Sequence, residues 1–123
     1  MAQHEIALPL HGGCLCGAVR YRVEGAPLLA YVCHCHNCQT RSGAAFSLSI
    51  LVRSADLAIA GPMSTHRRRS ARGQAIEYDG CAVCGVGLTG RAAATADFSS
   101  LRAGTLDDAA LSQAWRATAP SFR

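Results

Sequence analysis

The chain contains no lysine, and aromatic residues make up only 6% of its 123 residues. All 12 basic residues are therefore arginines, a bias that, together with the many alanines, indicates a GC-rich genome rather than a functional need. So few aromatic side chains leave a thin hydrophobic core, which needs reinforcement of another kind.

The chain also has no apolar run long enough for a membrane-spanning helix, which excludes a protein built on such helices. Residues 1 to 12 include His4, Glu5 and Pro9 where a secretory signal peptide would need an apolar stretch. There is no internal repeat, low-complexity linker or domain boundary. We therefore expect one cytoplasmic domain that spans residues 1–123, with its core at about residues 12 to 117.

What the chain does have is seven cysteines in three clusters: Cys14-Leu-Cys16, Cys33-His-Cys35-His-Asn-Cys38 and Cys81-Ala-Val-Cys84. An odd count does not suit a disulfide framework, and a loop of one or two residues would strain a disulfide. Cysteines at this spacing can instead turn their sulfurs onto one zinc ion about 2.3 Å away. Seven divides into a closed structural site of four thiolates and a site of three that keeps a position for water or substrate.

The first and last clusters are each followed by a glycine, Gly17 and Gly85. Glycine tolerates the positive φ that lets backbone N–H groups point at sulfur, so these two clusters are typical of structural zinc knuckles. The middle cluster also carries His34 and His36, which makes it the better candidate for chemistry. Either histidine could complete a closed site of three cysteines and one histidine, carry a proton near neutral pH, or remain solvated.

The formal net charge of +4 raises the question of nucleic acid. Seven thiolates would remove seven charges and two zinc ions would return four, leaving +1. The basic run Arg67-Arg68-Arg69 is more simply a solvated loop or an edge strand. No two-cysteine, two-histidine finger or aromatic-interleaved basic motif is present, so we expect no nucleic-acid partner.

Strand periodicity dominates the rest of the sequence. Apolar residues alternate with polar ones, or form short runs between turns, in five segments: Val19–Val23, Leu28–Val32, Phe46–Ile50, Leu57–Ala60 and Ile76–Tyr78. The tail after Ala119 is expected to be loose. The predicted class is mainly β.

One helix is expected, in residues 107 to 117, with Thr105 or Asp107 as its N-cap. Leu111 and Trp115 are four residues apart, so they would share one face of this helix.

The ordered motifs CxC, CHCxxCQ with SGAAF after it, CxxCG and AGTLDD resemble the glutathione-dependent formaldehyde-activating family of zinc proteins. The resemblance runs from about Gly12 to Asp108, and all seven ligand positions are filled. In this family the residue before the last CxxC is usually aromatic and a small hydroxyl residue commonly follows its CG, whereas Gly80 and Val86 stand there in this chain. These departures bear on the wall of the substrate pocket more than on the fold.

The resemblance implies a twisted fold of several small antiparallel sheets with zinc knuckles and one short C-terminal helix. It also implies two zinc ions. The structural ion would be held by Cys14, Cys16, Cys81 and Cys84, and the catalytic ion by Cys33, Cys35 and Cys38. A thiol such as glutathione would take the remaining position on the catalytic ion. Gln39, Arg41 and Ser42 are candidates for contacts with that substrate, Arg41 because a guanidinium pairs well with carboxylates.

The implied activity is that of a carbon–sulfur lyase similar to S-(hydroxymethyl)glutathione synthase, which joins a small thiol to formaldehyde or a related aldehyde. Three thiolates make zinc a weak Lewis acid, which disfavours a bound hydroxide and suits a soft thiolate ligand. The alternative is a non-catalytic interaction module with two structural zinc ions. A protein ligand in the fourth position of the second ion would favour that module. The sequence is compatible with a homo-oligomer but does not determine the oligomeric state.

Overall fold

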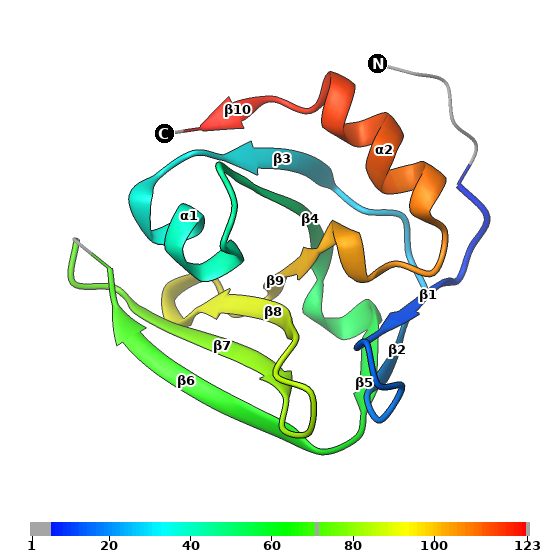
Figure 1. Ribbon diagram of the computed structural model, residues 1–123, viewed down its shortest axis with the longest axis horizontal. Coiled ribbons are helices and arrows are strands. Elements are labelled where there is room, and N and C mark those ends of the chain that lie inside the picture. The colour runs from blue at the N-terminus through cyan, green and yellow to red at the C-terminus, as the bar shows by residue number, and fades with distance from the viewer. Residues whose placement is uncertain (1–5, 71, 123) are drawn as a thin grey trace.

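In a computed structural model of the chain, which describes residues 6–70 and 72–122, the strands form two sheets (Figure 1). The smaller sheet has the antiparallel order β1-β2-β5, with bounds Leu10–Gly13, Arg20–Val23 and Leu57–Ala60. The larger sheet has the order β10-β3-β4-β9-β8-β7-β6. Its strands are β3 Leu29–Cys33, β4 Ser47–Arg53, β6 Met63–Arg69, β7 Ala75–Cys81, β8 Gly87–Ala92, β9 Phe98–Arg102 and β10 Ser121–Phe122.

The mainly β class is thus confirmed. All five segments expected to be extended contain strands, namely β2, β3, β4, β5 and β7. The described tail is not loose, because β10 pairs in parallel with β3 and the backbone N–H of Val32 donates to the carbonyl of Pro120 at 2.8 Å. The basic run of residues 67 to 69 ends β6, which is an edge strand as expected.

The C-terminal helix α2 (Ala109–Thr118) is confirmed, although its N-cap is Asp108 rather than Thr105 or Asp107. The Asp108 side chain accepts a hydrogen bond from the backbone N–H of Ala110. Leu111 and Trp115 are both buried on the face of α2 that meets the core. No described helix is long and apolar enough to span a membrane.

The expectation of one helix is wrong, because the segment after β3 forms a second helix, α1 (His36–Ser42). It begins at Cys35, whose sulfur caps the helix by accepting from the backbone N–H of Cys38, and it ends at Gly43, where φ is 67°. None of its residues is buried, so it has no apolar face whose period could have revealed it. Three 3-10 turns, Ser54–Asp56, Ala93–Thr95 and Ala103–Thr105, complete the described elements.

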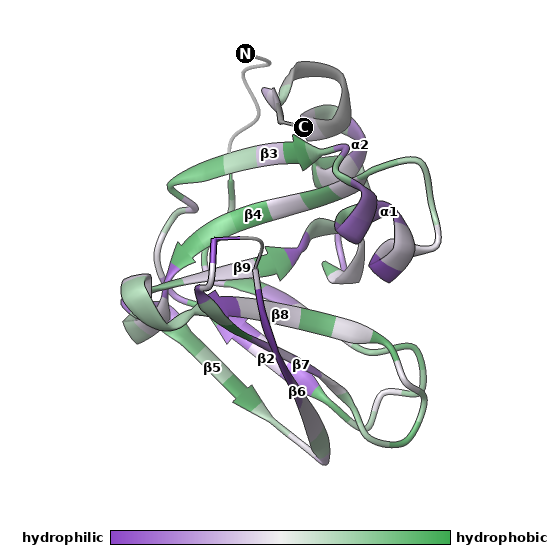
Figure 2. Cartoon of the chain, turned by 90° about the vertical axis from the view of Figure 1, so that its left-hand side faces the viewer, coloured by the Kyte–Doolittle hydropathy of each residue, from purple (hydrophilic) through white to green (hydrophobic). Residues whose placement is uncertain are grey.

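The two faces of β4 have different roles. Ile50 and Val52 point into the core, where both are almost completely buried. Ser47 and Ser49 alternate with them and so point to the opposite face of the sheet, yet they are also buried. Figure 2 shows the contrast between the mostly apolar β4 and β5 and the polar edge strand β6. Something other than solvent therefore covers the serine face.

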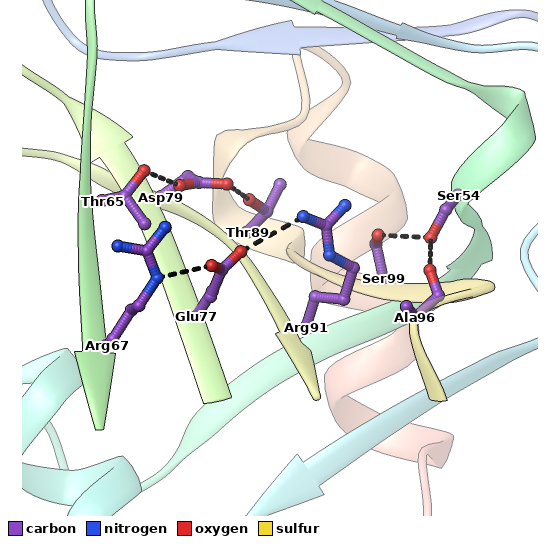
Figure 3. A network of polar contacts seen from close by, with 9 residues as sticks. All are labelled: Ser54, Thr65, Arg67, Glu77, Asp79, Thr89, Arg91, Ala96 and Ser99. Atoms are coloured by element: carbon purple, nitrogen blue, oxygen red, sulfur yellow. Dashed lines mark hydrogen bonds and ion pairs between the residues drawn. The ribbon is translucent and has the colours of Figure 1, made fainter. Parts of the chain in front are cut away.

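A polar ladder crosses β6, β7 and β8 at the far end of the larger sheet (Figure 3). Glu77 accepts from Arg67 at 2.7 Å and from Arg91 at 3.3 Å, and these three residues are direct cross-strand neighbours. In the next rung Asp79 accepts from Thr65 at 2.5 Å and from Thr89 at 3.5 Å. The ladder holds the register of the edge and engages the first arginine of the basic run.

Candidate functional site

The turn between β1 and β2 meets the end of β7 and the turn after it. This contact brings together the sulfurs of the four-cysteine cluster, Cys14, Cys16, Cys81 and Cys84, within 4.8 Å of one another. Cys16 Sγ lies 3.6 Å from Cys14 Sγ and 3.7 Å from Cys81 Sγ. A disulfide needs about 2.05 Å, whereas four sulfurs at about 2.3 Å from a tetrahedral zinc lie about 3.8 Å apart. The donor set and its spacing therefore fit a four-thiolate metal site.

Backbone N–H groups point at these sulfurs, as the glycines led us to expect. Val19 donates to Cys14 Sγ at 3.2 Å, and Cys84 donates to Cys81 Sγ at 3.3 Å. Gly17 and Gly85 have φ of 82° and 79°, in the left-handed region that turns the chain back after each pair. The expected conformation of both knuckles is confirmed.

These contacts change the acidity of the thiols. The backbone N–H of Val86 is the main cause that lowers the pKa of Cys84 to about 6, and the N–H of Val19 lowers the pKa of Cys14. The N–H of Ala18 lowers the pKa of Cys16, but burial and the neighbouring cysteines outweigh it and bring that pKa to about 11. Backbone dipoles thus stabilise thiolates, the form that binds metal.

The three-cysteine cluster, Cys33, Cys35 and Cys38, lies where β3 passes into α1. Cys33 Sγ lies 3.4 Å from Cys35 Sγ, and the backbone N–H of Cys38 donates to Cys35 Sγ at 3.4 Å. That N–H lowers the pKa of Cys35, whereas burial raises the pKa of Cys33 to about 12. All three sulfurs lie within 4.8 Å of one another, a donor set suited to a soft ion such as zinc.

No histidine, aspartate or glutamate among the described residues brings a ligand atom into the three-cysteine cluster. The ring of His34 lies instead against Phe46, with 5.8 Å between the ring centroids. His36 is exposed in the first turn of α1. Neither histidine completes a closed metal site in this structure.

A cavity of about 330 Å³, here called the Cys38 cavity, lies between α1 and the serine face of the larger sheet. Cys38 and Arg41 reach it from α1. Tyr31, Ser49 and Arg102 line it from the sheet, where they are direct neighbours on β3, β4 and β9. The cavity therefore brings one cysteine of the three-cysteine cluster together with residues that carry hydroxyl and guanidinium groups.

Tyr78 on β7 supports the arginine of α1. The guanidinium carbon of Arg41 lies 3.3 Å from the centroid of the Tyr78 ring, close enough for a cation–π interaction. Arg68 Nε donates to the Tyr78 hydroxyl at 3.0 Å. Gly90 lies opposite Tyr78 on β8, and a Cβ there would be only 3.1 Å from the ring. The missing side chain of Gly90 thus gives the ring its place beneath Arg41.

Of the residues considered for substrate contacts, only Arg41 lines the Cys38 cavity. Gln39 Nε2 donates to the carbonyl of Ala45 at 3.1 Å. Ser42 Oγ donates to the carbonyl of Phe46 at 3.1 Å, although Ser42 also lines a second cavity of about 410 Å³. Both side chains hold the loop between α1 and β4.

Several residues that line the Cys38 cavity were not predicted from the sequence as site residues, among them Arg102, Ser47, Ser49 and Tyr78. For the two serines a signal existed, because they alternate with apolar residues on a strand that turned out to be buried on both faces. For Arg102 there was no such pattern, because the sequence around it did not predict the strand β9.

Comparison with known proteins adds a family and a fold. The sequence model described as "Glutathione-dependent formaldehyde-activating enzyme" matches residues 9–123. Among solved structures the chain is similar to a protein of Rhodobacter sphaeroides, with a TM-score of 0.69 and 19% sequence identity, over 90% of this chain and 98% of that chain. At that identity the likeness shows the fold alone. No curated protein matches the chain.

Proposed function

Because the chain belongs to the family of glutathione-dependent formaldehyde-activating enzymes, we propose that it is a zinc-dependent carbon–sulfur lyase. It would join glutathione or a similar small thiol to formaldehyde or a related aldehyde. The observation that carries this proposal is the three-cysteine cluster beside the Cys38 cavity, which no fourth protein ligand closes among the described residues. An interaction module would need no such cavity beside a metal site.

The four-cysteine cluster would hold a structural zinc. Its ligands come from two turns that are far apart in the sequence, since even the nearest pair, Cys16 and Cys81, lies 65 positions apart. Cys14 and Cys81 are buried among core residues, so this ion would be anchored in the core, although Cys16 is exposed. Four thiolates also leave a tetrahedral ion no further position.

The three-cysteine cluster would hold the second zinc. When bound, that ion supplies a soft cation that keeps a sulfur ligand deprotonated at neutral pH. Three thiolates leave it a net charge of −1, so an activated hydroxide, and with it hydrolysis, is disfavoured. The chemistry of the donor set therefore favours a thiol substrate.

In the proposed reaction a bond forms between the thiol sulfur and the carbonyl carbon, and the thiol proton ends on the carbonyl oxygen. The product is an S-hydroxyalkyl adduct, and the reverse reaction breaks the same carbon–sulfur bond. Ser47 is the direct cross-strand neighbour of Cys33 and lines the Cys38 cavity, so its hydroxyl can donate to the carbonyl oxygen as negative charge develops there. Most of the rate gain would come from holding thiol and aldehyde together in the cavity.

The test is the rate at which glutathione and formaldehyde form the adduct, measured by NMR against buffer alone. We expect the protein loaded with two zinc ions to accelerate adduct formation. Cys35→Ala should abolish the acceleration, and Arg53→Gln, a change at an exposed residue of β4 that does not line the cavity, should keep it. A fully loaded protein without acceleration, or a folded Cys35→Ala variant that retains it, would contradict the proposal.

A further inference from the structure

Two arginines beside the three-cysteine cluster have no acidic partner within the described part of the chain. Arg41 and Arg102 both line the Cys38 cavity and both line the second cavity, and none of the described residues that line either cavity is an aspartate or glutamate. Arg91, the third arginine of the Cys38 cavity, pairs with Glu77 at 3.3 Å. Among the described residues, Arg41 and Arg102 form no such ion pair.

The fold places both arginines at the cavity. Arg102 lies on β9 directly opposite Ser49, and Arg41 lies over the ring of Tyr78. Stacking occupies one face of a guanidinium but leaves the N–H groups at its edge able to donate, and their fork matches the two oxygens of a carboxylate. Arg41 is therefore prepared to bind an anion without first giving up its contact with Tyr78.

The positive charges of Arg41 and Arg102 also repel each other. Partial burial of its guanidinium and, after that, the charge of Arg102 lower the pKa of Arg41, although the residue as a whole is exposed. An arginine remains protonated despite such a shift, so the repulsion between the two charges stays until an anion relieves it. Two like charges at one cavity wall, with no acid between them, are the arrangement that a bound carboxylate would neutralise.

We propose that Arg41 and Arg102 form the carboxylate-binding subsite for the thiol substrate, so that the site selects thiols that carry a carboxylate over neutral thiols. This inference rests on the proposed function, because it takes the three-cysteine cluster as the place where the sulfur binds. Cys38 and the two arginines line one cavity of about 330 Å³, so one small molecule can place its sulfur at the three-cysteine cluster and its carboxylate at the arginines. A cavity of this size is at the lower end of those that enclose small ligands.

The test is calorimetric titration of the metal-loaded chain with three ligands: glutathione, glutathione dimethyl ester, and S-methylglutathione, which keeps the carboxylates but has no free thiol. We expect the ester to bind about 10- to 100-fold more weakly than glutathione, the range of a charge-assisted hydrogen-bonded pair. Arg102→Gln should weaken glutathione binding by the same factor and leave ester binding unchanged. Arg53→Gln is the matched control and should change neither.

The ligands separate the failure of this inference from that of the proposed function. Equal affinity of unaltered protein for glutathione and its ester would overturn the carboxylate subsite while leaving thiol binding intact, and it requires no variant to fold. Equal affinity for glutathione and S-methylglutathione, both weakened by Arg102→Gln, would support the subsite and contradict sulfur binding at the metal. Loss of ester binding in Arg102→Gln would show that the arginine acts on something other than the carboxylate.

Discussion

Serine in place of Cys84 should destabilise the protein more than serine in place of Cys38. Both cysteines are half-buried metal-ligand candidates, so the chemical change is matched. They differ in what their clusters connect. The four-cysteine cluster joins Cys16 to Cys81, which are 65 positions apart, while the three-cysteine cluster lies within one short segment from Cys33 to Cys38.

The expected difference follows from the entropy that a crosslink removes from the unfolded chain. The chain-entropy relation for crosslinks gives ~4 kcal/mol for a loop of about 65 residues and ~2 kcal/mol for one of about 5 residues. Cys84→Ser should therefore cost ~2 kcal/mol more than Cys38→Ser. For a domain of this length that difference is roughly 8 °C in the midpoint of thermal unfolding.

The assay is thermal and urea unfolding followed by circular dichroism, on variants that native mass spectrometry shows to have lost one zinc ion each. The unaltered protein loaded with two zinc ions is the reference. If Cys38→Ser lowers the midpoint as much as Cys84→Ser or more, the assignment of the four-cysteine cluster as the structural crosslink is incorrect.

Two further predictions concern the smaller sheet. Burial raises the pKa of Tyr21 from 10.0 to about 12, so the contribution of its neutral hydroxyl to stability is fully present below pH 10 and falls by ~2 kcal/mol as pH rises to 12. Tyr21→Phe should lose less stability over this range in urea unfolding at each pH, and identical pH profiles would refute the argument. A methyl group at Gly12 would overlap the Tyr21 hydroxyl and the Thr105 carbonyl, so Gly12→Ala should cost ~1–3 kcal/mol or more. Gly104→Ala, which meets open space, should be close to neutral, and equal thermal midpoints for the two alanine variants would contradict the packing seen here.

The metal clusters could be predicted because their geometry is largely local. A pair such as Cys81 and Cys84 needs only a two-residue turn and the glycine after it to bring two sulfurs together. That the first and last clusters meet is not a local property, and spacing alone could not pair Cys14 with Cys81. The family resemblance supplied this pairing, and the structure brings these sulfurs together.

The helix α1 could not be predicted from periodicity. It is seven residues long, has no buried face, and is capped by the sulfur of Cys35 rather than by a usual capping residue. Its effect on the site is large, because it carries both Cys38 and Arg41 to the cavity.

Strand register determines which residues of the sheet form the wall of the Cys38 cavity. Arg102 reaches the wall because β9 pairs with β4, which places it opposite Ser49, more than 50 positions earlier in the chain. The strands β8 and β9 contain glycines or serines at positions where apolar residues would show the alternation of a strand, so they were not predicted. Contacts of this kind depend on tertiary pairing and leave little trace in a single sequence.

The most direct test of the central claim is zinc X-ray absorption spectroscopy of the protein with and without glutathione. Four cysteines on one ion and three on the other predict an average of about 3.5 sulfur neighbours per zinc at about 2.3 Å, rising to about 4 when the thiol binds. That rise would support an open metal position that takes the thiol substrate. An average that does not respond to glutathione, or a nitrogen neighbour that persists in its presence, would contradict the account.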